Sequence, residues 1–269
     1  MEINFDETDA TWDAFVTSSP QRSIFVRSAF LKSLDSNYAL VTCYDGDRIV
    51  AGTPVMMGLD GRPLTSVHPF TQYQGLLLAP SRSGRRTASG TPQELSAVAC
   101  LAQALVSRFG GLCLEHSWRL EDLRALQWLN FGASDVGHFG FDLRYTAILD
   151  LLQFATFDDY LTSVRPVRRQ EHRKAGRAFE IESTADESML DALHEKTLER
   201  SGGSRSERDS GLVRSITRQA LRSGYGSLRS VRIEEWSAPC FRSRAGESRW
   251  LPSVGAVPSV FDRGLVVQA

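Results

Sequence analysis

The sequence predicts an α/β protein built from two similar units, the second of them incomplete. Strand-like and helix-like patterns alternate along most of the chain, with turn residues between them. The two halves also begin alike, because a strand-like Glu2–Phe5 and a helix start at Trp12–Val16 parallel Ala147–Leu151 and Phe157–Leu161. We therefore expect two tandem units whose mixed, largely antiparallel sheets are flanked by helices.

Composition divides the chain into three parts. We expect a first unit at residues 1–140, the start of a second unit at 141–226, and an atypical tail at 227–269. The tail is rich in Ser, Arg, Gly, Trp and Pro, and strand-like runs occur in it only at Ser227–Ile233 and Leu265–Val267. Its tryptophans argue against simple disorder. We hypothesise that the tail is translated out of frame, which reading the gene in its other two frames would test.

The strongest local signal in the first unit is a β-hairpin. Tyr38–Tyr44 and Ile49–Met57 are apolar runs that flank the turn Asp45–Arg48. A helix is expected to begin after the cap residues Thr8 and Asp9. Further strands are predicted at Leu64–Val67, Tyr73–Leu78 and Leu112–Leu114, and further helices around Val26–Leu34, Leu95–Phe109 and Leu120–Leu129.

The second unit is organised around residues 145–179. An apolar run at Tyr145–Leu151 predicts a buried strand, and the apolar spacing in Phe157–Val164 predicts an amphipathic helix. Pro166 suits the first turn of the next helix, which is strongly basic. Beyond it we expect a strand at Glu180–Ser183, a helix from Asp186 to Thr197, and a helix from Asp209 to Gly224.

The overall composition is that of an ordinary globular protein. Hydrophobic residues make up 42% and charged residues 23%, and the net charge of −1 gives no whole-molecule field that attracts nucleic acid or membranes. Cys43, Cys100, Cys113 and Cys240 form no CxxC pair, and the first three are expected to be buried free thiols. No apolar run reaches the length of a membrane span, and the N-terminus lacks a leader pattern, so a cytoplasmic protein is expected.

Several segments, taken in order, resemble the FemAB-type branch of the GNAT acyltransferase superfamily, a group of acetyltransferases linked to cell-envelope and polysaccharide biosynthesis. The segments are Trp12–Phe15 with Phe30–Leu34, Ile49–Pro54, Pro69–Leu77, Tyr145–Leu151, and Phe157–Leu161 leading to Arg168–Arg177. The resemblance implies two tandem GNAT-like halves. It also implies N-acyl transfer from acetyl-CoA or another acyl-CoA to an amine of a small molecule or an envelope or polysaccharide precursor. In some relatives aminoacyl-tRNA is the donor.

The chain departs from this family pattern after Gly226. The hairpin and the strand–helix pair that close the donor cleft in the family are absent from the sequence there. This departure favours an alternative, an inactive remnant or a non-catalytic binding protein. Arg173–Ala178 fits the family's donor signature R/Q-x-x-G-x-G/A. It lies at the end of a predicted helix, however, whereas phosphates bind at helix beginnings, so a chance match is the better interpretation.

The first candidate site is the polar and aromatic loop that precedes Leu76. His68 is a candidate general base and Tyr73 a candidate general acid. Gln72, Tyr73, Gln74 and Gly75 are candidate substrate-binding residues, since glycine allows a ligand to approach the backbone closely. The alternative interpretation is an ordinary turn that contains a packed tyrosine.

The second candidate site is the basic helix. Arg168, Arg169 and Arg173 could bind an anionic donor or acceptor, because arginine forms bidentate contacts with phosphate. The alternatives are a solvated helix face and sequence-independent RNA binding, in which tRNA would be a partner. The histidines show no metal-ligand spacing and no serine lies in a GxSxG motif, so we expect neither a metal site nor a hydrolase.

Overall fold

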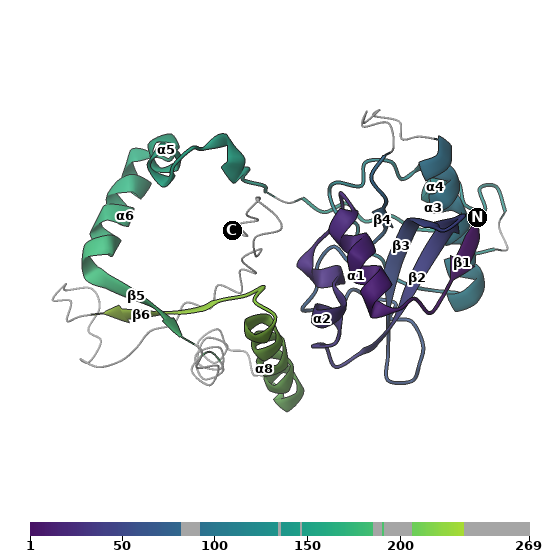
Figure 1. Cartoon of the computed structure of the whole chain (residues 1–269), viewed down its shortest axis with the longest axis horizontal. Coiled ribbons are helices and arrows are strands. Elements are labelled where there is room, and N and C mark those ends of the chain that lie inside the picture. The colour runs from purple at the N-terminus through teal and green to yellow at the C-terminus, as the bar shows by residue number, and fades with distance from the viewer. Residues whose placement is uncertain (82–91, 134–135, 146, 185–189, 191–205, 234–269) are drawn as a thin grey trace. The chain divides into compact units, whose positions relative to one another are not determined.

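The computed structural model describes residues 1–81, 92–133, 136–145, 147–184, 190 and 206–233. Its contacts divide the chain into two compact units, Met1–Leu143 and Arg144–Ala269, which are taken in turn (Figure 1). The predicted helix from Asp186 and the tail beyond Ile233 fall outside the described residues, apart from Leu190. The predicted domain bounds stay predictions.

The first unit is built on a four-stranded antiparallel sheet with the order β1-β2-β3-β4. β2 (Asn37–Asp45) and β3 (Arg48–Met57) form the predicted hairpin, and Gly46 supplies the positive φ of 61° that its tight turn requires. β1 (Glu2–Asn4) pairs with the other edge of β2. β4 (Leu77–Leu78) pairs with Ala51 and Gly52.

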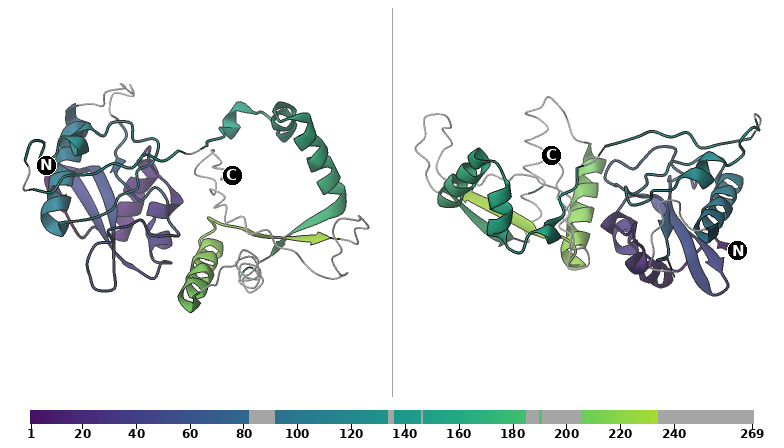
Figure 2. Two further views of the ribbon diagram at one scale, coloured as in Figure 1. Left: turned by 180° about the vertical axis from the view of Figure 1, so that it is seen from behind. Right: turned by 90° about the horizontal axis from the view of Figure 1, so that it is seen from above.

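Helix α1 (Asp9–Ser18) covers one face of this sheet (Figures 1 and 2). It begins as predicted at Thr8, whose hydroxyl accepts the N–H of Thr11. The Trp12 and Phe15 rings lie against Gly52 of β3, where an added Cβ would be 2.8 Å from the indole. The buried Trp12 indole donates to the carbonyl of Val26 at 2.6 Å, which connects α1 to the 3₁₀ turn η1 (Ile24–Val26) and α2 (Ser28–Leu31).

Helix α3 (Pro92–Phe109) covers the opposite face and forms the main core (Figure 2). Its apolar residues recur at helical spacing and pack with side chains of β2, β3 and the short helix α4 (Arg124–Gln127). Burying each Val or Leu side chain contributes about 1.5–3 kcal/mol relative to exposing it. The buried members are Ala97, Val98, Leu101, Ala102 and Leu105 of α3, with Val41, Cys43, Val50, Ala51, Val55, Leu76, Leu120, Ala125, Leu126 and Leu129.

The second unit has helices and a two-stranded sheet. β5 (Phe179–Thr184) and β6 (Leu228–Ile233) pair antiparallel, from Phe179 opposite Ile233 to Thr184 opposite Leu228, which confirms both predicted strands. Its helical elements are η2 (Leu151–Gln153), α5 (Phe157–Ser163), α6 (Pro166–Ala178) and α8 (Glu207–Arg222). No described helix has the length and apolar character that crossing a membrane demands.

Two predicted strands are wrong. The run Tyr145–Leu151 was expected to be buried, but Tyr145 is 99% exposed and Ile148 43% exposed. An apolar run becomes a strand only when a neighbour supplies ladder hydrogen bonds, and none of the described strands pairs along this one. Leu112–Leu114 is likewise outside the sheet, and Cys113 is exposed rather than buried.

Other predicted elements are shorter than expected. Tyr73–Leu78 shrinks to β4 because Tyr73 has a positive φ of 56°, which a strand does not allow. Leu64–Val67 forms no strand, although Pro63 makes an isolated bridge with Met57. The helices expected at Val26–Leu34 and Leu120–Leu129 reduce to the short α2 and α4. The α/β class with an antiparallel sheet is confirmed, and the tandem GNAT-like halves stay a prediction.

Candidate functional site

The candidate loop runs from the end of β3 to β4 in the first unit. Its first part returns alongside β3, where Leu64 N–H donates to Met56 O at 2.8 Å. The carbonyl of Leu64 then accepts the N–H of Cys113 at 3.1 Å. These two bonds place residues 64–76 between β3 and the segment 113–116. The structure therefore brings His68 and residues 72–75 together on one loop.

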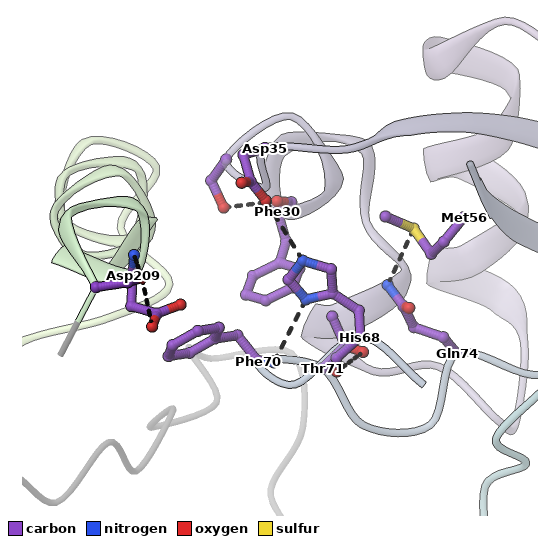
Figure 3. Close-up of polar contacts among 10 residues, drawn as sticks. Phe30, Asp35, Met56, His68, Phe70, Thr71, Gln74 and Asp209 are labelled. Carbon is purple, nitrogen blue, oxygen red and sulfur yellow. Dashed lines mark hydrogen bonds and ion pairs between the residues drawn. The ribbon is translucent and has the colours of Figure 1, made fainter. Parts of the chain in front are cut away.

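His68 is buried and closes a tight turn in this loop (Figure 3). Its carbonyl accepts both the N–H of Thr71 at 3.0 Å and the hydroxyl of Thr71 at 2.8 Å. The ring Nδ1 faces the N–H of Phe70 at 3.4 Å, and Nε2 lies 3.6 Å from a carboxylate oxygen of Asp35. Because Nδ1 accepts, the proton of the neutral ring resides on Nε2, facing Asp35. Both ring nitrogens thus already contact protein groups.

Tyr73 and Gln74 are fixed through polar contacts with distant segments. The N–H of Tyr73 donates to the carboxylate of Glu115 at 3.1 Å, and this contact accompanies its left-handed backbone. The buried Gln74 amide donates to the carbonyl of Phe25 at 3.2 Å and lies 3.6 Å from the sulfur of Met56 (Figure 3). The Gln74 side chain therefore anchors the loop and does not project as a free ligand group.

Gly75 lies where the loop passes His116 at close range. A Cβ at this position would be 2.5 Å from Nδ1 of His116 and 2.7 Å from the carbonyl of Glu115, so only glycine fits without a shift. The Gly75 carbonyl accepts the hydroxyl of Thr53 at 3.2 Å, and Nδ1 of His116 accepts the N–H of Leu76 at 3.2 Å. Burial lowers the pKa of His116 to about 4, which keeps its ring neutral and able to accept that bond.

A small cavity lies beneath the loop. It leaves about 10 Å³ for the centre of a water molecule, which is enough for roughly one water and far too little for an acyl group with its carrier. A cavity of this size does not by itself form a substrate pocket. Its lining residues are Pro54, Met56, Leu64, Ser66, Val67, His68, Gln74, Cys113 and Glu115.

The three candidate arginines lie in the second unit, on α6 (Figure 1). Arg168 pairs with Glu171 at 2.7 Å, and Arg169 donates to the carbonyl of Thr162 at the end of α5 at 2.9 Å. Arg173 is exposed and has no partner among the described residues. The signature match at Arg173–Ala178 occupies the last turns of α6, where the helix presents carbonyl groups and disfavours phosphate.

Comparison with known proteins gives structural likeness without a match in sequence. No protein-family model matches the sequence, and no curated protein does either. A solved structure titled "Crystal structure of FemX" matches with a TM-score of 0.58 at 16% sequence identity. The match covers 87% of this chain and 58% of the FemX chain. The chain has a Fem-type fold. It spans little more than half the length of that neighbour.

Three site residues were missed by sequence reasoning. Asp35, Glu115 and His116 hold the loop, yet they lie in segments separated from it by about 30–50 positions. For Glu115 and His116 the sequence does carry a signal, since two polar residues directly after the apolar run Leu112–Leu114 are unusual for a buried strand. The sequence assigns no role to His116, because the histidines show no metal-ligand spacing.

Proposed function

We propose that the chain is an N-acyltransferase that takes its acyl group from acyl-CoA. The observation that carries the proposal is the likeness to FemX, which extends over 87% of the chain. Supporting it is the set of sequence segments that resemble FemAB-type GNAT acyltransferases and occur in the family's order. The acceptor is an amine of a small molecule or of a cell-envelope or polysaccharide precursor.

Acyl transfer from a thioester requires little acid–base catalysis by protein side chains. The amine nitrogen attacks the thioester carbonyl, the carbon–sulfur bond breaks, and CoA leaves as the thiolate while the amine loses a proton to water or to the departing sulfur. Since the thioester is already activated, positioning the amine and stabilising the oxyanion supply most of the rate. A loop held rigidly through its backbone, as residues 68–76 are, suits that task.

The contacts in the loop assign different roles to the two candidate catalytic residues. His68 acts as a positioning residue, because Nδ1 and Nε2 already face Phe70 and Asp35. Tyr73 is the candidate acid that protonates the leaving thiolate and regains a proton from water, and Gln72 next to it in the sequence is a candidate substrate-binding residue. Gly75 supports the loop in the same way as His68, because His116 and Glu115 fill the space that a side chain would occupy there.

For the anionic part of the donor, Arg173 is the first choice on α6. Arg168 and Arg169 already contact Glu171 and Thr162, whereas Arg173 is exposed with no described partner. Its guanidinium is therefore available for a charge-assisted contact with a CoA phosphate. The same basic helix supports the second candidate, transfer from aminoacyl-tRNA, because six cationic side chains at Arg165–Arg177 would contact an RNA backbone.

A non-catalytic protein is the remaining candidate. One observation favours it: none of the side chains described in α5 is buried.

Thermal shift with acetyl-CoA and with tRNA separates these candidates. If acyl-CoA is the donor, acetyl-CoA at 100 times its Kd stabilises the folded protein by about 2.7 kcal/mol and raises its Tm. Arg173→Ala is expected to weaken that binding roughly tenfold, because a charge-assisted contact is lost. Arg222→Ala, a change of the same residue type at an exposed position of α8, is the matched control and should leave affinity unchanged.

The outcomes are distinct. Release of free CoA in the presence of an amine panel supports the acyl-CoA donor. Binding of tRNA with a steep salt dependence, and none of CoA, supports the aminoacyl-tRNA donor. A protein that binds neither CoA nor tRNA overturns the transferase proposal and leaves the non-catalytic candidate.

A further inference from the structure

Two cysteines meet in the core of the first unit. Cys43 lies on β2 and is completely buried, whereas Cys100 lies on α3 and is partly buried. Both belong to the apolar cluster in which α3 packs on the sheet. They are 57 positions apart in the sequence, so their meeting depends on the fold and not on any spacing motif.

Small side chains allow the helix to approach the sheet closely at this point. Cys43 is paired across the hairpin with Ala51, and Ala97 and Ala102 of α3 are completely buried at the same interface. The two thiols interact directly and both are reduced. Burial, reinforced by the neighbouring Cys100, raises the pKa of Cys43 to about 12.

We propose that Cys43 and Cys100 are a redox pair that closes into a disulfide between β2 and α3 when a small disulfide oxidant such as oxidised glutathione is present. The pair is independent of the proposed acyl transfer, because none of the residues assigned to that reaction takes part. Cys113 is exposed and belongs to the loop region, so it serves as an internal comparison.

The exchange proceeds in two balanced steps. The thiolate of Cys100, the more exposed of the two, attacks one sulfur of oxidised glutathione, and one glutathione leaves as its thiolate. The sulfur of Cys43 then attacks Cys100 Sγ, forms the protein disulfide, and releases the second glutathione, which takes up the proton from Cys43. Two thiols are oxidised and one glutathione disulfide is reduced. Because the Cys43 thiolate is scarce at neutral pH, the second step is slow and accelerates as pH rises.

The closed disulfide would stabilise the first unit. It joins residues 57 positions apart, and cross-linking a loop of that length restricts the unfolded chain substantially. We expect oxidation to raise the Tm by roughly 5–10 °C. The reduced protein would show the lower Tm again after treatment with a reductant.

The test is disulfide mapping of the full chain. Reduced protein is incubated with oxidised glutathione, blocked with an alkylating reagent, digested, and analysed by mass spectrometry. The expected product is a Cys43 peptide linked to a Cys100 peptide, formed faster at pH 9 than at pH 7. In Cys43→Ala, the mixed disulfide of Cys100 with glutathione should accumulate, and Cys113→Ser should leave the crosslink unchanged.

Two results would overturn the proposal of a Cys43–Cys100 redox pair. One is exhaustive oxidation that yields only glutathione adducts while Cys43 remains a free thiol. The other is a crosslink from Cys43 or Cys100 to a different cysteine. Mapping of the wild-type chain decides between these outcomes even if Cys43→Ala fails to fold.

Discussion

At the scale of single residues, the candidate loop is held through its backbone by side chains from a distant segment. Glu115 accepts the N–H of Tyr73, and His116 accepts the N–H of Leu76. Gly75 lies between these two bonds, at a distance from His116 that excludes any side chain. Backbone groups tied in this way keep their positions when a substrate binds, which is what positioning catalysis needs.

This arrangement predicts a pH dependence of stability. Burial holds the pKa of His116 near 4, below the value of about 6.5 that it regains on unfolding. The unfolded state therefore binds a proton more readily, so the contribution is complete above pH 6.5 and is lost as pH falls towards 4. We expect this histidine to account for roughly 1–3 kcal/mol of lost stability between those pH values.

The measurement is urea unfolding at several pH values for the wild type and His116→Asn. Asparagine keeps an acceptor for the N–H of Leu76 and does not titrate. The difference between the two stability curves removes the contribution of the carboxylates. Parallel curves for the two proteins between pH 7 and pH 4.5 would show that His116 titrates normally.

The residues of the loop could be named from the sequence, but their roles could not. His68 and Tyr73 are side chains that a catalytic site would use, and both lie on the connection between β3 and β4. The engagement of His68 with Asp35 and Phe70 depends on contacts that no local pattern encodes. The prediction that Cys113 is buried is wrong for a related reason, since the apolar run around it forms no strand in the sheet.

At the scale of elements, the sequence predicted those helices and strands correctly whose ends are marked by a local capping or turn residue. The hairpin β2–β3 has its turn glycine, α1 has its Thr8 cap, and α6 begins at Pro166. The run Tyr145–Leu151 has apolar character, but none of the described strands pairs along it, and a strand needs a neighbour for its ladder hydrogen bonds. Periodicity therefore predicts helices with caps better than strands whose partners come from elsewhere.

The helix α5 depends strongly on its cap. No α5 side chain is buried, and short helices without tertiary packing are marginal in water. Thr156 and Asp159 form a capping box, in which the Asp159 N–H donates to the Thr156 hydroxyl at 3.2 Å and the Thr156 N–H donates to the carboxylate at 2.9 Å. Aromatic contacts of Tyr160 with Phe154 and Phe157 add to it.

We predict that Thr156→Ala destabilises α5 locally by about 1 kcal/mol. Amide hydrogen exchange in residues 157–163 should become roughly fivefold faster, because the helix opens more often. Thr162→Ala is the control, since the Thr162 hydroxyl only donates back to the Asp158 carbonyl within the helix. Equal exchange rates in Thr156→Ala and the wild type would mean that packing, and not the cap, maintains α5.

At the scale of the whole molecule, the buried apolar side chains that the structure describes are distributed unevenly between the two units. The main cluster joins β2, β3, α3 and α4 and lies entirely within Met1–Leu143. In the second unit, the buried apolar side chains among the described residues are Leu190, Leu212, Val213 and Tyr225. Because apolar burial is the dominant favourable term in folding, the first unit should be the more stable of the two.

This difference predicts that the two units unfold separately in the intact chain. Leu101→Ala removes a completely buried side chain of α3 and should cost about 2–5 kcal/mol in the first unit. Native-state hydrogen exchange should then show faster opening of β2, β3 and α3, while the amides of α8 exchange at the wild-type rate. Leu212→Ala, in the core-facing side of α8, is the reciprocal variant and should accelerate exchange in α8 alone. If Leu101→Ala accelerates exchange in α8 as much as in α3, the chain unfolds as one cooperative unit and the division at Leu143 has no energetic meaning.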